Sequence, residues 1–203
     1  MSNRAPSSLG MDQESGIGNS SFPGGRLTTS GRYVSRGVLV AATRFHGHLG
    51  PWLVLGLKAG AYARKKLGAS PFELSARVFC PAGTPYTCLV DGVQFSSGCT
   101  MGKGNIRHVR AAGCRVEFVR KGNRLHHKDT KARRGARAPG RPSRVVLTVR
   151  QEVWDELHSG PDKGMAGAAR LGREIARRSL SELFSERSGA GRAPTRAPRP
   201  ASK

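Results

Sequence analysis

The basic residues of this chain are concentrated in two segments that contain few large apolar side chains. Residues 120–144 contain ten Lys or Arg against one acid, Asp129, and residues 187–203 contain five Lys or Arg and no acid. Both segments are rich in Gly, Pro, Ala and Arg, so they cannot bury enough apolar surface to offset the entropy that a chain loses on folding. We therefore expect a basic insertion at about 120–144 and a disordered basic tail at 187–203.

The start of the chain has a different composition but leads to a similar expectation. Residues 1–32 contain no apolar stretch of the length found in a signal peptide, so they are expected to form a disordered leader. No window approaches eighteen apolar residues, which predicts no membrane span. Four cysteines in a chain without a secretory signal favour reduced thiols or metal ligands over a disulfide framework, which indicates the cytoplasm. Cys80 and Cys114 lie at the ends of predicted strands and are expected in the core.

The remaining residues, 33–186, are long enough for a single domain with its own hydrophobic core. Apolar residues recur at helical spacing over residues 51–68, with Pro51 at a favourable first-turn position and a closing glycine after a basic last turn. The sequence "FELSARVFC" (72–80) alternates as a half-buried strand. A short helix is expected over residues 91–97.

The second half of this region adds two strands and two helices. The sequences "RVEFVRKGNR" (115–124) and "SRVVLTVRQE" (143–152) predict a hairpin that is interrupted by the basic insertion. Residues 151–157 predict a short helix, and residues 165–184 predict an amphipathic helix. The apolar stripe of the latter contains Leu171, Ile175 and Leu183. Because strands and helices do not alternate regularly, the fold class is α+β, a single domain with a mixed or antiparallel sheet packed by helices.

The run "CLVDGVQFSSGCTMGKGN", residues 88–105, ends in a glycine-rich turn that invites comparison with a phosphate-binding loop. A P-loop requires G-x-x-x-x-G-K-[ST] after a strand. Here Gly98 and Gly102 are separated by three residues, and Lys103 is followed by Gly104 instead of Ser or Thr. The pattern therefore argues against a P-loop, and the glycines indicate positive φ angles or a close approach of the backbone.

Two histidines and two cysteines are the candidate metal ligands. His46 and His48 precede the first long helix, and Cys88 and Cys99 bound the helix expected between them. Imidazole and thiolate together suit zinc and related divalent metals, although the C-x-x-C spacing of a structural zinc site is missing. The alternative is that the histidines lie at the surface and the cysteines are small buried hydrophobes.

Two motifs carry a resemblance to a known family. The segments "FHGHLGP" and "CLVDGVQFSSGCTMGKGN" resemble the FmdE-like domains of formylmethanofuran dehydrogenase, whose members carry an F-H-G-H-x-C-P-like segment, C-x-x-D-x-(I/V)-Q and G-C-T-x-G-K-G-N. The match covers roughly residues 33–157. It implies an α+β core, a homodimer, and a metal-binding cleft with one motif on each wall.

The resemblance also implies roles for individual residues. The implied ligands of a divalent metal, with zinc expected, are His46, His48, Cys88 and Cys99. The implied polar surround consists of Gln94 and Asn105 as cofactor-binding residues and Asp91 and Lys103 as candidate catalytic residues, with Lys103 suited to a small anionic substrate.

The chain departs from the family pattern at two places. Many members have cysteine before the proline, where this chain has Gly50, so one expected ligand is absent. Some members carry a C-terminal zinc finger with paired cysteines, but this chain has no cysteine after Cys114. The loss of a thiolate at position 50 is expected to weaken metal binding, to change the metal, or to leave a site for a small molecule without metal.

Three functions are compatible with these observations. The first is an accessory or catalytic domain in one-carbon metabolism linked to a molybdenum or tungsten enzyme, as the family implies. The second is a metal-binding or metal-delivery module without catalysis. The third is non-specific association with nucleic acid through the basic segments, which is expected to be sequence-independent and sensitive to salt. Coding bias alone also produces basic loops without a partner.

Overall fold

A computed structural model describes residues 34–120, 142–159 and 164–189 of the protein. Its elements, in chain order, are α1 (Arg36–His46), α2 (Pro51–Leu67), β1 (Leu74–Cys80), α3 (Cys88–Ser97), β2 (Ile106–Arg110), β3 (Arg115–Arg120), β4 (Arg144–Val149), α4 (Gln151–Ser159), α5 (Met165–Arg177), α6 (Leu180–Leu183) and β5 (Phe184–Gly189). The predicted leader, most of the basic insertion and the end of the tail lie outside the described residues. None of the described helices combines the length and apolarity that a membrane crossing requires.

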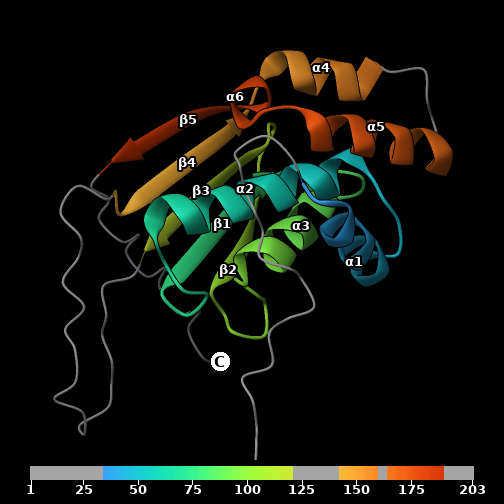
Figure 1. Ribbon diagram of the computed structural model, residues 1–203. Helices are drawn as coiled ribbons and strands as arrows, with labels where there is room; N and C mark the ends of the chain where they lie inside the picture. The colour runs from blue at the N-terminus through green and yellow to red at the C-terminus, as the bar shows by residue number, and fades with distance from the viewer. Residues whose placement is uncertain (1–33, 121–141, 160–163, 190–203) are drawn as a thin grey trace, which may run out of the picture.

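The strands form one mixed sheet in the order β2-β1-β3-β4-β5. β1 and β2 are parallel because α3 connects them, whereas the other neighbouring strands are antiparallel. Figure 1 shows α2 and α3 in front of the sheet, with α1 beside α3 and α5 beside the first half of α2. This arrangement confirms the predicted α+β class, and the pairing of β3 with β4 confirms the predicted hairpin.

The long helix α2 is the centre of the core. It starts at Pro51, ends at Gly68 in the left-handed conformation, and carries basic residues in its last turn, as predicted. Its side chains are buried on nearly all sides, because the sheet, α3 and α5 surround it. A helix that is enclosed in this way fixes the position of whatever precedes its first turn.

The helices α2 and α3 cross with their backbones in contact. A Cβ atom at Gly56 would lie 2.3 Å from the Leu89 carbonyl oxygen, and one at Gly92 would lie 2.1 Å from the Leu53 carbonyl oxygen. Ser96 Oγ donates a hydrogen bond across this contact to the Gly56 carbonyl oxygen at 3.2 Å. Only glycine allows such an approach, so the glycines hold the first turns of α2 and α3 in a fixed relation.

The structure corrects the prediction at the end of the domain. The amphipathic pattern over residues 165–184 predicted one helix, but α5 ends at Arg177 and the extended residue Arg178 follows it. Ser179 then begins α6 with a capping box, in which its hydroxyl accepts from the Glu182 backbone and the Glu182 carboxylate accepts from the Ser179 backbone. Residues 184–189 continue as β5, so residues 187–189, assigned by composition to the tail, belong to the sheet.

Three other elements also differ from the expectation. Neither α1 nor β2 was predicted, and α3 begins at Cys88, three residues before the predicted start. The strand β2 has only one buried side chain at its start and a largely exposed remainder, so its residues show no alternation. It forms because it pairs with β1, and an edge strand of this kind leaves little local signal.

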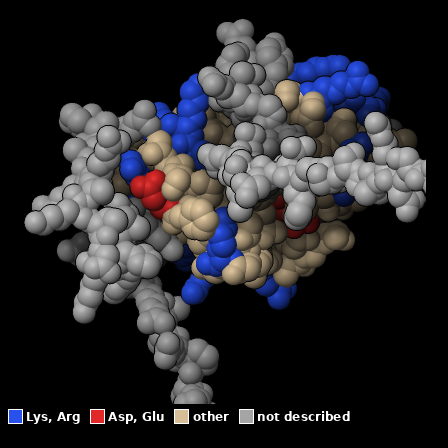
Figure 2. Space-filling model, turned by 60° about the horizontal axis from the view of Figure 1, so that its bottom comes forward, with Lys and Arg blue, Asp and Glu red and all other residues tan. Residues whose placement is uncertain are grey.

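The surface charge of the described residues is mixed. On the face drawn in Figure 2, Lys and Arg side chains occur at several separate places and acidic side chains in small patches. On the sheet, Glu117 is buried beneath arginines from its own and neighbouring strands, with Arg144 Nη2 at 3.2 Å from its Oε1 and Arg77 Nη1 at 3.8 Å from its Oε2. Part of the basic charge in the folded region is therefore paired within the sheet.

Candidate metal centre

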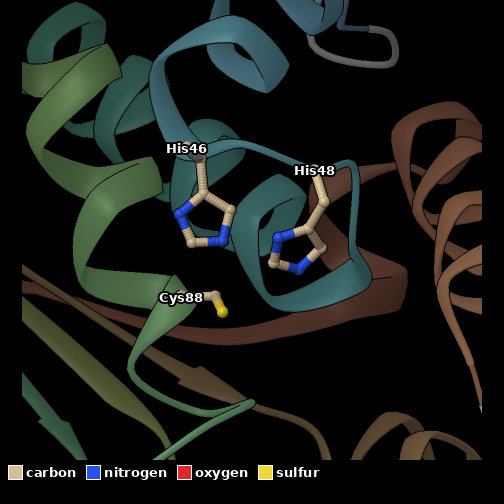
Figure 3. Close-up of side chains that lie close together, drawn as sticks. All are labelled: His46, His48 and Cys88. Atoms are coloured by element: carbon tan, nitrogen blue, oxygen red, sulfur yellow. The ribbon is translucent and has the colours of Figure 1, made fainter.

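Three of the predicted ligands come together where α1, α2 and α3 meet. The candidate ligand atoms of His46, His48 and Cys88 all lie within 4.8 Å of one another. Figure 3 shows the two imidazole rings beside each other, with the Cys88 sulfur below them. The ring centroids of the histidines are 4.5 Å apart. We call this group the His–His–Cys site.

His46 is the last residue of α1, and the end of that helix directs it toward α3. Gly47 caps the helix in the left-handed conformation, with φ of 95° and its backbone N–H donating to the Thr43 carbonyl oxygen. The His46 Nδ1 atom lies 2.8 Å from Asp91 Oδ2 in the first turns of α3. The His46 Nε2 atom is buried and has no hydrogen-bond partner among the described residues. Since a carboxylate only accepts, Nδ1 carries a proton, and in the neutral ring Nε2 is then the atom with a lone pair for a metal.

His48 lies in the turn between α1 and α2. Burial lowers the pKa of its imidazole below the usual value, and the neighbouring His46 lowers it further. Both effects favour the neutral ring, which is the form that binds a metal. A Cβ atom at Gly50 would lie 3.4 Å from His48 Nε2. A side chain at position 50 would therefore reach the His–His–Cys site.

Cys88 is the first residue of α3, and its side chain is 6% exposed. Burial raises the pKa of its thiol, and the Asp91 carboxylate raises it further. Without a metal the sulfur is therefore protonated at neutral pH. A bound cation favours the thiolate, so metal binding at this site releases a proton.

A chain of polar contacts supports the His46 ring from α3. Asp91 Oδ1 accepts from Gln94 Nε2 at 3.3 Å, and Gln94 Oε1 accepts from the Met101 backbone N–H at 2.9 Å. Asp91 thus holds His46 with one oxygen while Gln94 holds Asp91 through the other. Carboxylates that orient metal-binding histidines commonly have this arrangement.

The site can be compared with known proteins. Residues 45–187, more than half of the chain, match the family described as "FmdE, Molybdenum formylmethanofuran dehydrogenase operon". The chain belongs to this family. The match includes all three residues of the His–His–Cys site and extends through β4 and α5 into β5, beyond the segment covered by the two motifs.

The FmdE domain is also similar to part of a larger protein from Archaeoglobus fulgidus, described as "Probable S-adenosyl-L-methionine-binding protein". The two are 31% identical over 91 residues, which are 41% of this chain and 24% of the relative. This chain therefore aligns with about a quarter of the relative's length.

The structure does not bring Cys99 to the His–His–Cys site of this FmdE domain. Cys99 follows the other end of α3, and ten residues of helix separate the ends by about 15 Å. Its side chain is fully buried, and its backbone N–H donates to Ser97 Oγ at 3.0 Å. A shared set of ligands with Cys88 is impossible over that distance, because zinc–sulfur bonds are about 2.3 Å long.

The remaining predicted polar residues lie at the same end of α3 as Cys99. Asn105 Oδ1 accepts from the Thr100 backbone N–H, and its Nδ2 donates to the carbonyl oxygens of Pro71 and Leu74 at 2.9 and 3.0 Å. Lys103 Nζ donates to the Gly98 carbonyl oxygen. Both side chains bind backbone groups in or beside the glycine turn, whereas Asp91 contacts His46 and Gln94 connects Asp91 to the Met101 backbone.

Two features of the structure were not found from the sequence. The helix α1 could have been predicted from Ser35, whose hydroxyl accepts from the Val38 backbone, and from the closing Gly47. The second feature is an aromatic cluster in which Trp52, Tyr86, Trp154 and His158 contact one another, with Tyr86 Oη 2.5 Å from His158 Nε2. Trp154 and His158 lie four positions apart on α4, but Trp52 and Tyr86 come from separate parts of the chain, so no local pattern signals the whole cluster.

Proposed function

We propose that this protein is a metal-binding FmdE domain that holds one zinc-like divalent ion with His46, His48 and Cys88. The observation that carries this proposal is the buried, unpartnered Nε2 atom of His46 beside two further ligand atoms. A buried nitrogen without a partner costs free energy, and a bound cation removes that cost. The donor set of two imidazoles and one thiol suits zinc.

Three protein ligands leave room for a fourth group. Structural zinc sites have four protein ligands, whereas sites that bind a substrate or water have three. The position of Gly50 supports the second type, since a family cysteine at this place would start 3.4 Å from His48 Nε2. The expected exogenous ligand is a small molecule with an oxygen or sulfur donor.

When bound with an open position, zinc supplies Lewis-acid chemistry toward a carbonyl group or a water molecule. The chain's own residues prepare the site. Asp91 holds the proton on His46 Nδ1 and so keeps the Nε2 lone pair available. Its direct contact with His46 supports a positioning role for Asp91, with Gln94 holding the carboxylate in place. We infer a ligand-binding or catalytic role in one-carbon metabolism linked to a molybdenum or tungsten enzyme.

Titration of the metal-free, full-length protein with Co²⁺ tests the proposal. The wild type should bind one equivalent and show a thiolate-to-cobalt charge-transfer absorption. Loss of an outer-shell partner already costs about 10–100-fold in affinity, so Cys88→Ser should cost more than about 100-fold and remove the absorption. Cys99→Ser is the matched control and should keep both. Equal binding by the wild type and Cys88→Ser would refute the proposed site.

Substitution of Gly50 tests whether the site is open. The φ angle of Gly50 is −146°, which any residue adopts, so Gly50→Cys fits the backbone. The added thiol should tighten Co²⁺ binding and prevent azide or a small thiol from changing the cobalt spectrum. Gly50→Ala adds the Cβ atom without a ligand and should leave the spectral response to azide. If the wild type gives no response to azide or thiols, the domain is better explained as a delivery or storage module.

A second candidate is binding of S-adenosyl-L-methionine, which the description of the Archaeoglobus fulgidus relative suggests. Calorimetric titration of the zinc-loaded and metal-free protein with this compound tests it directly. Binding that disappears in His46→Ala would connect the compound to the His–His–Cys site. An absence of binding in both forms would remove this candidate without affecting the metal proposal.

A further inference from the structure

Cys80 and Cys114 face each other on two neighbouring antiparallel strands. The last residue pair in the register of β1 and β3 is Phe79 with Arg115, so Cys80 at the end of β1 is opposite Cys114, just before β3. Both cysteines are buried and carry free thiols. Neither belongs to the His–His–Cys site.

The hydrogen bonds of the backbone define the type of this pair. The Cys80 carbonyl oxygen accepts from Ala111, on the β2 side, at 3.1 Å. The Cys114 carbonyl oxygen accepts from Val149, at the end of β4, at 2.9 Å. Each cysteine therefore directs its backbone groups away from the other. This is the non-hydrogen-bonded type of antiparallel pair, in which opposite Cα atoms are about 4.5 Å apart.

The two side chains also lie on the same face of the sheet. In the preceding pair, the Arg115 guanidinium lies 4.0 Å from the centre of the Phe79 ring, whereas Cys80 and Cys114 belong to the hydrophobic core that the sheet shares with α2 and α3. Because successive residues of a strand point to opposite faces, Cys80 and Cys114 both point toward the helices. A disulfide requires Cα atoms about 4.4–6.8 Å apart and Cβ atoms on the same side, and the separation of about 4.5 Å that is usual for a non-hydrogen-bonded pair lies within this range.

The environment makes the two thiols unequal. A hydrogen bond from Cys114 and the nearby His108 ring lower the pKa of Cys80 to about 7. The same hydrogen bond and burial raise the pKa of Cys114 well above its usual value. His108 Nε2 lies 3.1 Å from the Cys80 carbonyl oxygen, and His108 is exposed on the edge strand β2. Cys80 is thus the better nucleophile of the two.

We propose that Cys80 and Cys114 are a site of reversible disulfide formation, with a small peroxide as the oxidant. The Cys80 thiolate attacks one peroxide oxygen, the O–O bond breaks, and the other oxygen leaves as water after it takes up a proton, which leaves a sulfenic acid on Cys80. The Cys114 sulfur then attacks the Cys80 sulfur. The S–S bond forms, the S–O bond breaks and a second water leaves, so the two thiols give two electrons to the peroxide.

Burial defines which oxidant reaches the pair. The exposed fractions of Cys80 and Cys114 are 0% and 3%, so a bulky disulfide such as oxidised glutathione is excluded from the folded protein. Hydrogen peroxide is small enough to enter during local opening of the edge strand β2. A dithiol reductant added to the oxidised protein under mild denaturation should restore both thiols.

Peptide mapping of the full-length protein tests this inference. The protein is reduced, freed of metal and treated with hydrogen peroxide, and it is then alkylated and digested without reductant. We expect a linked pair of peptides that contains Cys80 and Cys114, a mass two hydrogens lower than that of the separate peptides, and release of both peptides by dithiothreitol. Cys99, a buried cysteine at the far end of α3, should remain in unlinked peptides.

Three outcomes would overturn the inference. They are a dominant link between Cys80 and Cys88, oxidation of Cys80 to sulfinic acid without a link to Cys114, and the absence of oxidation at either cysteine while exposed methionines are oxidised. Because the decisive measurement uses the wild type, it does not depend on the folding of a variant. As a further control, Cys99→Ser should form the Cys80–Cys114 link to the same extent, and Cys114→Ser should not.

Discussion

The two ends of α3 carry similar residues but use them differently. At the first end, Cys88 lies beside two histidines, and the buried Nε2 atom of His46 has no hydrogen-bond partner. At the last end, the side chains of Ser97, Lys103 and Asn105 bind backbone groups of the glycine turn, and Asn105 also binds the carbonyl oxygens of Pro71 and Leu74. The first end therefore has a nitrogen atom available to bind a ligand, whereas the polar side chains at the last end stabilise the conformation of the turn.

This difference shows why a motif cannot be assigned to one role as a whole. A tight turn exposes backbone N–H and C=O groups that a helix or strand would otherwise pair, so nearby side chains must pair them. Asn105 accepts one such bond from Thr100 and donates two to the carbonyl oxygens of Pro71 and Leu74, so it ties the turn that contains Cys99 to the segment at the start of β1. The motif "CLVDGVQFSSGCTMGKGN" thus contributes a candidate ligand at its start and a structural turn at its end.

The largest effect is expected at the close contact between α2 and α3, which fixes the position of α3 and therefore of both its ends. In Gly92→Ala, the new Cβ atom would lie 2.1 Å from the Leu53 carbonyl oxygen and would push α3 away from α2. We expect a loss of about 3 kcal/mol or more in the free energy of unfolding, or no folding. Gly102→Ala is the matched control in the same motif, since no atom lies within 4 Å of its added Cβ. Urea denaturation of both variants checks this, and equal stabilities would refute the close helix contact.

The next effect concerns the last end of α3 alone. Asn105→Ala removes three hydrogen bonds and leaves the Thr100 N–H and two carbonyl oxygens without their partner. We expect a loss of about 2–3 kcal/mol in the free energy of unfolding. The Co²⁺ affinity of the folded variant should equal that of the wild type. A variant of normal stability with weaker Co²⁺ binding would indicate that Asn105 contributes to the His–His–Cys site and not to the stability of the turn.

A smaller effect is expected at the first end. Asp91→Asn keeps the shape of the side chain but weakens its hold on the protonated Nδ1 atom of His46. The Co²⁺ affinity should fall by about 10–100-fold, as for other outer-shell partners of metal-binding histidines. Equilibrium titration against a chelator measures the change, and urea denaturation of the metal-free protein should show little change. Gln94→Glu tests the same chain of contacts one step further out and should have a weaker effect.

The smallest effect is a pH dependence of metal affinity, which should arise from Cys88 at the first end of α3. The Cys88 thiol must lose a proton to bind metal, and its pKa is raised above the usual value. The pKa of His48 is lowered, so this ring is already neutral at pH 7 and releases no proton when the metal binds. Between about pH 7 and about pH 8, the affinity should rise by about tenfold. This slope should persist in Cys99→Ser, and a pH-independent affinity of the wild type would argue against Cys88 as a ligand.

The sequence by itself determined the parts of the fold whose side chains carry a local pattern. Pro51, Gly68 and the apolar spacing between them define α2, and alternation defines β1 and the β3–β4 hairpin. The two motifs also identified the family, and they contain the three residues that lie together in the His–His–Cys site. The predictions of helices and strands succeed because burial of one face of a helix or strand leaves a regular period in the residues of that segment alone.

Only the tertiary structure decided the rest. The start of β5 was predicted as the end of a helix, because the pairing that makes it a strand is supplied by β4 and not by its own residues. Cys88 and Cys99 had equal standing in the sequence, and both are buried. Their separation follows from the length of α3, and the approach of Cys88 to His46 follows from the glycine contact between α2 and α3. Distances between segments depend on how helices pack, and that packing joins residues that no local pattern connects.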